Sequence, residues 1–85
     1  MNKRIIVGIY ISERVQHVPD VQKTLTEFGC QIKTRLGLHE VSDNLCSPNG
    51  LLLLEMHGDE NEIRKMEKAL SGIAGVEVKE MVFGA

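Results

Sequence analysis

Residues 35–56, RLGLHEVSDNLCSPNGLLLLEM, contain the stretch that decides the fold. Residues 51–54 are four consecutive leucines, the most apolar run in the chain. A short apolar run that follows a turn signal such as Asn-Gly is typical of a strand buried on both faces. A polar segment stands directly before this run, so potential ligand residues lie next to the core.

A second strand of the same kind is expected at Arg4–Ile11. Aliphatic side chains alternate along one of its faces: Ile5, Val7, Ile9 and Ile11. Ile6 and Tyr10 make the opposite face apolar as well. A strand that is apolar on both faces belongs in the middle of a sheet, and the same holds for residues 51–57.

Two further segments alternate between apolar and polar residues, a pattern typical of edge strands. In residues 30–37 one face is expected to carry Cys30, Ile32, Thr34 and Leu36, with Cys30 in the core. In Val76–Phe83 most polar positions are charged, which indicates exposure. These two segments are therefore expected at the two edges of the sheet.

Two helices are predicted from one repeated spacing of apolar residues. Offsets of 0, 3, 7 and 10 residues bring side chains onto one helical face. The first stripe at these offsets comprises Val18, Val21, Leu25 and Phe28. The second stripe comprises Ile63, Met66, Leu70 and Ile73.

The residues at the helix ends support both helices. Pro19 is expected in the first turn of a helix over residues 18–28, and Gly29 as its left-handed stop. Asp59, followed three residues later by Glu62, has the spacing of an N-terminal capping box. Glycines at positions 72 and 75 bracket the end of the second helix.

The order strand, helix, strand, strand, helix, strand predicts an α+β fold, the ferredoxin-like (ACT-like) β-α-β-β-α-β sandwich. Residues 1–85 would form one domain, with a four-stranded antiparallel sheet and two helices on one face. The helices would leave Ile6 and Tyr10 uncovered on the other face. Such an apolar face predicts a homodimer, a tetramer or another homo-oligomer.

Composition excludes several function classes. The net charge is −2 and no basic stripe exists, so nucleic-acid binding is not expected. No segment approaches the roughly 18 apolar residues of a membrane span. Cys30 and Cys46, in a chain whose N-terminus reads as a strand, are expected to be reduced thiols in a cytoplasmic protein.

Residues 38–49 form a polar connection that holds the candidate metal ligands, His39 and Cys46. Imidazole and thiolate suit zinc, nickel or iron, so a transition metal ion is a candidate cofactor. A third ligand would come from His17, His57 or a second subunit. The alternative is that Cys46 is a partly buried small residue and His39 a solvated one.

The same connection offers ligand groups for a small molecule. Candidates in it are Leu38, His39, Asp43, Asn44 and Asn49, joined by His17 just before the first helix. The N–H groups at a helix start favour anions, which would suit a ligand there. The alternative is that the Asp and Asn residues form turns. The methionines Met56, Met66 and Met81 are expected in the core.

Short motifs carry a resemblance to a known family. Val18-Pro19-Asp20-Val21 at the helix start resembles ACT small-molecule sensing domains. Arg35-Leu36-Gly37-Leu38, with the glycines of residues 72–76, resembles the ACT-like iron-only hydrogenase system regulators over nearly the whole chain. The fold is also similar to the sensor domain of nickel-responsive regulators, but Gly58 and Asp59 after His57 leave no His-x-His pair. The resemblance implies a regulatory role and names no chemistry.

No catalytic signature supports an enzyme. The chain has no Ser-His-Asp or Cys-His arrangement and no glycine-rich phosphate loop. The sequence therefore favours a small oligomeric regulatory or sensor domain that binds a small molecule or metal ion at a subunit interface. Such a domain would also bind a partner protein, to which the oligomer would transmit its ligand state. The alternative is a ligand-free protein–protein interaction module that uses its edge strands.

Overall fold

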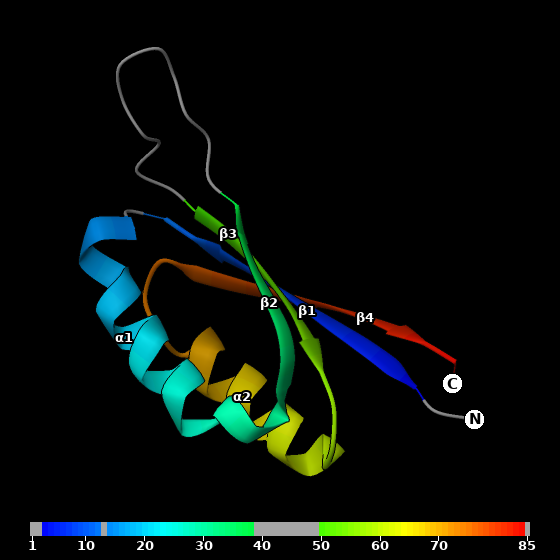
Figure 1. Ribbon diagram of the computed structural model, residues 1–85. Helices are drawn as coiled ribbons and strands as arrows, with labels where there is room; N and C mark the ends of the chain where they lie inside the picture. The colour runs from blue at the N-terminus through cyan, green and yellow to red at the C-terminus, as the bar shows by residue number, and fades with distance from the viewer. Residues whose placement is uncertain (1–2, 13, 39–49, 85) are drawn as a thin grey trace.

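The two doubly apolar strands occupy the middle of a four-stranded antiparallel sheet (Figure 1). The computed structural model describes residues 3–12, 14–38 and 50–84. Its elements are β1 (Arg4–Ile11), α1 (Arg14–Glu27), the 3-10 turn η1 (Gly29–Gln31), β2 (Ile32–Leu38), β3 (Gly50–Met56), α2 (Glu60–Ser71) and β4 (Val76–Phe83). The strand order is β2-β3-β1-β4, and both helices cover one face of the sheet. The predicted ferredoxin-like α+β fold is confirmed.

The register of the central pair brings the leucine run onto β1. Val7 pairs with Leu54, and Ile9 pairs with Leu52. Because paired residues share a face, these four side chains point to the helices, whereas Leu51 and Leu53 point to the other side. Strands apolar on both faces are thus central, as the sequence predicts.

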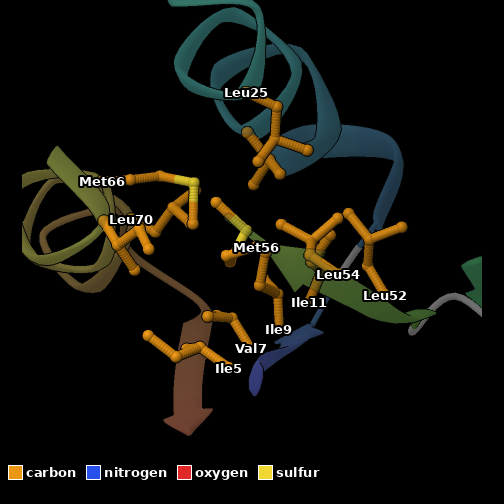
Figure 2. Close-up of a cluster of buried hydrophobic side chains, with 12 residues drawn as sticks. Ile5, Val7, Ile9, Ile11, Leu25, Leu52, Leu54, Met56, Met66 and Leu70 are labelled. Atoms are coloured by element: carbon orange, nitrogen blue, oxygen red, sulfur yellow. The ribbon is translucent and has the colours of Figure 1, made fainter. Parts of the chain in front are cut away.

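The core lies between the sheet and the two helices (Figure 2). Its buried members come from β1, β3, α1 and α2: Ile5, Val7, Ile9, Ile11, Val21, Leu25, Leu52, Leu54, Met56, Ile63, Met66 and Leu70. Val18, Phe28 and Ile73 pack against it, so both predicted helical stripes are confirmed. The prediction that Met81 is a core residue is wrong, because its side chain is 53% exposed.

Helix α1 begins earlier than predicted, at Arg14 rather than at residue 18. Pro19 therefore lies inside the helix and not in its first turn. Proline keeps a helical φ, so the helix continues through it and loses one backbone hydrogen bond. The packing of Val18 and Val21 against the core accounts for the helix on both sides of this position.

The connection from α1 to β2 differs from prediction in two ways. Gly29 opens η1 and is not among the glycines with positive φ, so it is no left-handed stop. Cys30 lies in η1 and is exposed, not in the core. The 3-10 turn occupies the residues that were expected to begin the strand, so β2 starts at Ile32.

An irregularity in β2 overturns its predicted alternation. Ile32 pairs with Met56, but Thr34 pairs with Glu55, so one residue of β2 is extra. A β-bulge of this kind moves the following side chains to the other face. Ile32 consequently packs on the core, whereas Thr34 and Leu36 lie on the face away from the helices.

Helix α2 begins as its cap predicts. The Asp59 carboxylate accepts a hydrogen bond from the Asn61 N–H at 2.8 Å. The Glu62 carboxylate contacts the Lys65 ammonium at 3.1 Å.

No helix among the described residues is both long and apolar enough to cross a membrane.

Candidate functional site

Two of the predicted ligand residues, His17 and Leu38, lie at one end of the sheet. At this end β1 and β2 finish, and β3 and β4 begin. The register pairs Leu38 with Leu51, which itself pairs with Tyr10 of β1. His17 follows β1 along the chain and lies inside the first part of α1, not just before the helix as predicted, because the helix begins at Arg14. The candidates His39, Asp43, Asn44, Cys46 and Asn49 lie outside the described residues.

His17 lies against the connection that leads into β4. A methyl group added at Gly75 would stand 2.7 Å from both Cδ2 and Nε2 of the imidazole. Gly75 has a φ of 78°, and its carbonyl accepts a hydrogen bond from the Ser12 N–H at 2.8 Å. The junctions β1–α1 and α2–β4 therefore meet here, and only a glycine leaves room for the His17 ring.

The structure separates His17 from Leu38. Leu38 belongs to the edge strand β2, and His17 contacts Gly75 ahead of the opposite edge strand β4. Strands β3 and β1 lie between the two edges. Leu38 and the His17–Gly75 contact therefore lie at the same end of the sheet but at its opposite edges.

No three His, Cys, Asp or Glu side chains in the described part of the chain are grouped so that they could hold a metal. His57 follows β3 at the end of the sheet opposite Leu38. Its backbone N–H donates a hydrogen bond to the Gln31 carbonyl. His17 is the described histidine at the end of the sheet where Leu38 lies.

The face of the sheet away from the helices is apolar and uncovered by any described element (Figure 1). We call it the open face. Its apolar side chains come from all four strands: Ile6, Tyr10, Leu36, Leu51, Leu53, Met81 and Phe83. Several are strongly exposed, including Tyr10 at 42% and Leu36 at 51%. A groove of about 330 Å³ runs over Gly8 on this face.

Two pairs of opposite charge lie on the open face, and Lys33 lies near one of them, at Glu55. Arg4 donates two hydrogen bonds to the Glu55 carboxylate, at 2.8 and 3.0 Å. The hydrogen bond from Arg4 lowers the pKa of Glu55, and the same contact raises the pKa of Arg4. Glu77 and Lys79 are 3.5 Å apart. No pattern in the sequence points to the Arg4–Glu55 pair, since only the β1–β3 register shows that these residues are neighbours.

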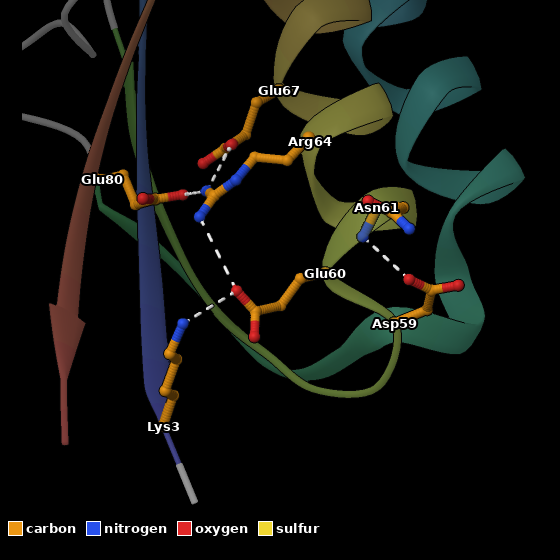
Figure 3. Close-up of polar contacts among 7 residues, drawn as sticks. All are labelled: Lys3, Asp59, Glu60, Asn61, Arg64, Glu67 and Glu80. Carbon is orange, nitrogen blue, oxygen red and sulfur yellow. Dashed lines mark hydrogen bonds and ion pairs between the residues drawn. The ribbon is translucent and has the colours of Figure 1, made fainter. Parts of the chain in front are cut away.

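A second, wider pocket of about 800 Å³ lies at the opposite end of the sheet. Lys3, Arg4 and Lys33 line it together with Glu55 and Glu60. Lys3 contacts Glu60 at 3.3 Å (Figure 3). Arg4 is bound to Glu55. Because acidic side chains already neutralise most of its basic ones, this pocket makes a weak anion site.

Helix α2 is joined to β4 by an ion cluster around Arg64 (Figure 3). The Arg64 guanidinium contacts Glu67 at 3.0 Å and also the carboxylate of Glu80. Burial, and then the neighbouring Glu80 carboxyl, raise the pKa of Glu67 against the effect of Arg64. Among the described atoms, the second carboxylate oxygen of Glu67 is buried without a hydrogen-bond partner.

Comparison with known proteins connects the chain to solved structures only. No family model matches it, and no curated protein matches it. An uncharacterized protein from Thermotoga maritima is 24% identical, with a TM-score of 0.81 over 98% of this chain and 100% of that one. At such identity the likeness shows a shared fold.

Two more distant structures share the fold. A nitrogen regulatory PII-like protein from Thiomonas intermedia K12, bound to ADP, AMP and bicarbonate, is 12% identical with a TM-score of 0.58, over 99% of this chain and 96% of that one. A dimeric ferredoxin-like protein from an uncultured marine organism is 11% identical with a TM-score of 0.54, over 95% and 92%. The chain thus has a fold that PII-like and ferredoxin-like proteins also have.

Proposed function

We propose that this chain is a small self-associating regulatory domain that binds a small ligand at a subunit interface. The observation that carries the proposal is the open face, which is apolar in all four strands and covered by no described element. A domain of 85 residues buries a limited share of its surface, so association through this face would add to its stability. The dimeric ferredoxin-like structure is in keeping with this proposal.

The ligand would bind at the end of the sheet that carries His17 and Leu38. His39, Asp43, Asn44 and Asn49, which follow Leu38 in the chain, would supply polar contacts. This end also borders the open face, because Leu51 and Tyr10 belong to both. A ligand held there would influence how two copies meet. The nucleotides and bicarbonate of the PII-like structure are the first ligands to test.

A transition metal ion is the second ligand class. His39 and Cys46 would hold it by imidazole and thiolate, with a further group from His17 or from a second copy. The role is one of binding rather than catalysis, because the chain has no Ser-His-Asp or Cys-His signature. Ligand binding would be passed on to a partner protein through the associated state.

A thermal-shift screen tests the ligand proposal. ADP, AMP, bicarbonate, amino acids, Zn²⁺, Ni²⁺ and Fe²⁺ would each be added to purified protein. A ligand present at 100 times its Kd stabilises the folded form by about 2.7 kcal/mol, which raises Tm by roughly 15 °C. His39→Ala should abolish this shift for any ligand, and Cys46→Ala should abolish it for a metal.

The chain offers matched controls for both substitutions. His57→Ala and Cys30→Ala remove the same groups at the opposite end of the sheet, and the shift should persist in both. A shift lost equally in the controls, or retained in His39→Ala, would contradict the proposed site.

A ligand-free interaction module is the alternative. Strand β4 is an eight-residue edge strand with exposed side chains along most of its length (Figure 1). Strand addition at such an edge is a common way to bind an extended peptide. The charges of Glu77, Lys79 and Glu80 also protect an edge from pairing, which favours the first proposal. The absence of a thermal shift with every ligand, together with β4-dependent capture of a partner peptide, would favour the alternative.

A further inference from the structure

A hollow lies in the middle of the open face, above Gly8. Gly8 sits between Leu53 of β3 and Lys79 of β4 in the sheet register. A Cβ atom built on Gly8 would meet only the Leu53 Cδ2 at 3.6 Å and the Lys79 carbonyl at 3.9 Å. Both are ordinary van der Waals distances, so a side chain atom could be accommodated above this glycine without a clash. The groove of about 330 Å³ marks this space.

A projecting side chain stands beside the hollow. Tyr10 is two residues along β1 from Gly8, on the same face, and therefore about 7 Å away along the strand. Its side chain is 42% exposed, and it is the largest side chain of β1 on this face. Tyrosine combines a large apolar ring with a hydroxyl that can form a hydrogen bond to polar groups or water. Tyrosine is enriched at protein interfaces for this reason.

We propose that two copies stack by their open faces, so that Tyr10 of each copy fills the hollow over Gly8 of the other. A two-fold axis that lies in the plane between the two sheets, and crosses β1 at right angles at Ile9, would place residue 8 of each copy opposite residue 10 of the other. One axis thus produces both contacts, as an isologous interface requires. This inference rests on the proposed self-association and specifies its surface and register.

Charge favours a second copy as the occupant. The charged side chains of the open face form two pairs within one chain, Arg4 with Glu55 and Glu77 with Lys79. Lys33 adds a positive charge beside Glu55, so the face carries charges of both signs in nearly equal number. Two identical faces can meet without the repulsion that a single-sign surface would cause.

The size of the face also suits a dimer. Four strands of seven or eight residues span about 27 Å by about 19 Å, or roughly 500 Å² in projection. The accessible area of a contoured face exceeds its projection, so the open face approaches the roughly 800 Å² per partner of a standard interface. The apolar centre, with one charge pair at an end of the face and the other along the edge strand β4, resembles the usual core-and-rim arrangement.

The chain supplies its own optical probe of the contact. Tyr10 is the only tyrosine, and there is no tryptophan. Sedimentation and acrylamide quenching of tyrosine emission would be measured over the same concentration series. As the dimer forms, Tyr10 emission should become shielded from acrylamide. A dimer whose Tyr10 stays as accessible as in the monomer would overturn the proposed register.

Two substitutions test the contact from both sides. Gly8→Leu fills the hollow, and Tyr10→Ala removes the side chain that enters it. Each should raise the dimer Kd by about 30-fold or more, the effect typical of a central interface residue. Gly29→Leu is the control, because Gly29 is exposed in η1 and nothing lies within 4 Å of its added Cβ. Far-UV circular dichroism would verify that each variant folds.

The outcomes separate this inference from the proposed function. A wild-type dimer that persists unchanged in Gly8→Leu and Tyr10→Ala would overturn the Tyr10–Gly8 contact and leave self-association standing. A wild-type chain that remains monomeric at every concentration would overturn both. Loss of dimer in the two variants but not in Gly29→Leu would support both.

Discussion

At Gly75, one backbone position connects two junctions of the fold. Its φ of 78° disfavours any side chain, and an added methyl would clash with the His17 ring. We expect Gly75→Ala to lower the free energy of unfolding by about 2–3 kcal/mol, as strain and clash add. Urea denaturation measures this loss.

Gly58→Ala is the matched control for this substitution. Gly58 has a φ of 89°, but its added Cβ would lie 3.9 Å from the nearest heavy atom, in Gln31. Gly58→Ala should lower the free energy of unfolding by about 1 kcal/mol, from backbone strain alone. The double variant His17→Ala/Gly75→Ala should recover the clash part of the Gly75 loss. Equal losses at both glycines would show that the His17 contact is not rigid.

The carboxyl of Glu67 predicts a pH dependence. Its pKa is raised in the fold by burial and by Glu80, so its contribution to stability is present below the unfolded pKa and is lost as pH rises through the folded pKa. Glu67→Gln stays neutral and can donate to Glu80. At pH 7 the free energy of unfolding of this variant should be about 1 kcal/mol higher than that of wild type, and this gain should vanish at acidic pH. Thermal unfolding from pH 4 to 8 would measure it.

Glu62→Gln is the control for this change, because Glu62 is paired with Lys65 on the same helix. It should show no comparable gain at pH 7. A gain in Glu67→Gln that is constant across the pH range would contradict a role for the raised pKa.

At the scale of elements, α1 carries a proline that its sequence would place at the helix start. Because α1 extends from Arg14 to Glu27, Pro19 removes one helical hydrogen bond and strains the turn before it. We expect Pro19→Ala to stabilise the protein by about 1–3 kcal/mol, measured by chemical denaturation. Asp20→Ala, at the next exposed position, reports the effect of helix propensity alone. A neutral or destabilising Pro19→Ala would show that the helix begins at the proline.

Strand β2 shows why the start and the facing of an element are harder to predict than its existence. Alternation in residues 30–37 correctly indicates a strand, but η1 and the bulge near Thr34 change its start and its facing. A single extra residue reverses every later side chain, and no local pattern shows where it is inserted. Leu36 therefore joins the open face and extends its apolar surface.

At the scale of the whole molecule, self-association makes stability depend on concentration. If only folded copies pair, a tenfold rise in protein concentration should raise Tm by about 3 °C. Differential scanning calorimetry at several concentrations measures this. Tyr10→Ala should show a Tm independent of concentration, whereas Gly29→Leu should behave as wild type. A wild-type Tm that is constant across a hundredfold range would contradict a dimer.

The sequence by itself determined the order of elements, the two core stripes and the apolar second face of the sheet. These follow from local repeats, since a strand alternates every two residues and a helix returns every 3.6. Val21 and Ile63 are buried for that reason. The candidate ligand residues were predicted from chemistry alone, and of these the structure places His17 and Leu38 at one end of the sheet.

Only the tertiary structure decided which distant residues meet. The Arg4–Glu55 pair, the His17–Gly75 contact and the position of Gly8 beside Tyr10 on an open face all depend on strand register and on how two connections pack. Register is selected by the whole set of side chains that fill the core, not by any one segment. Contacts between residues far apart in the chain therefore become visible only once that packing is complete.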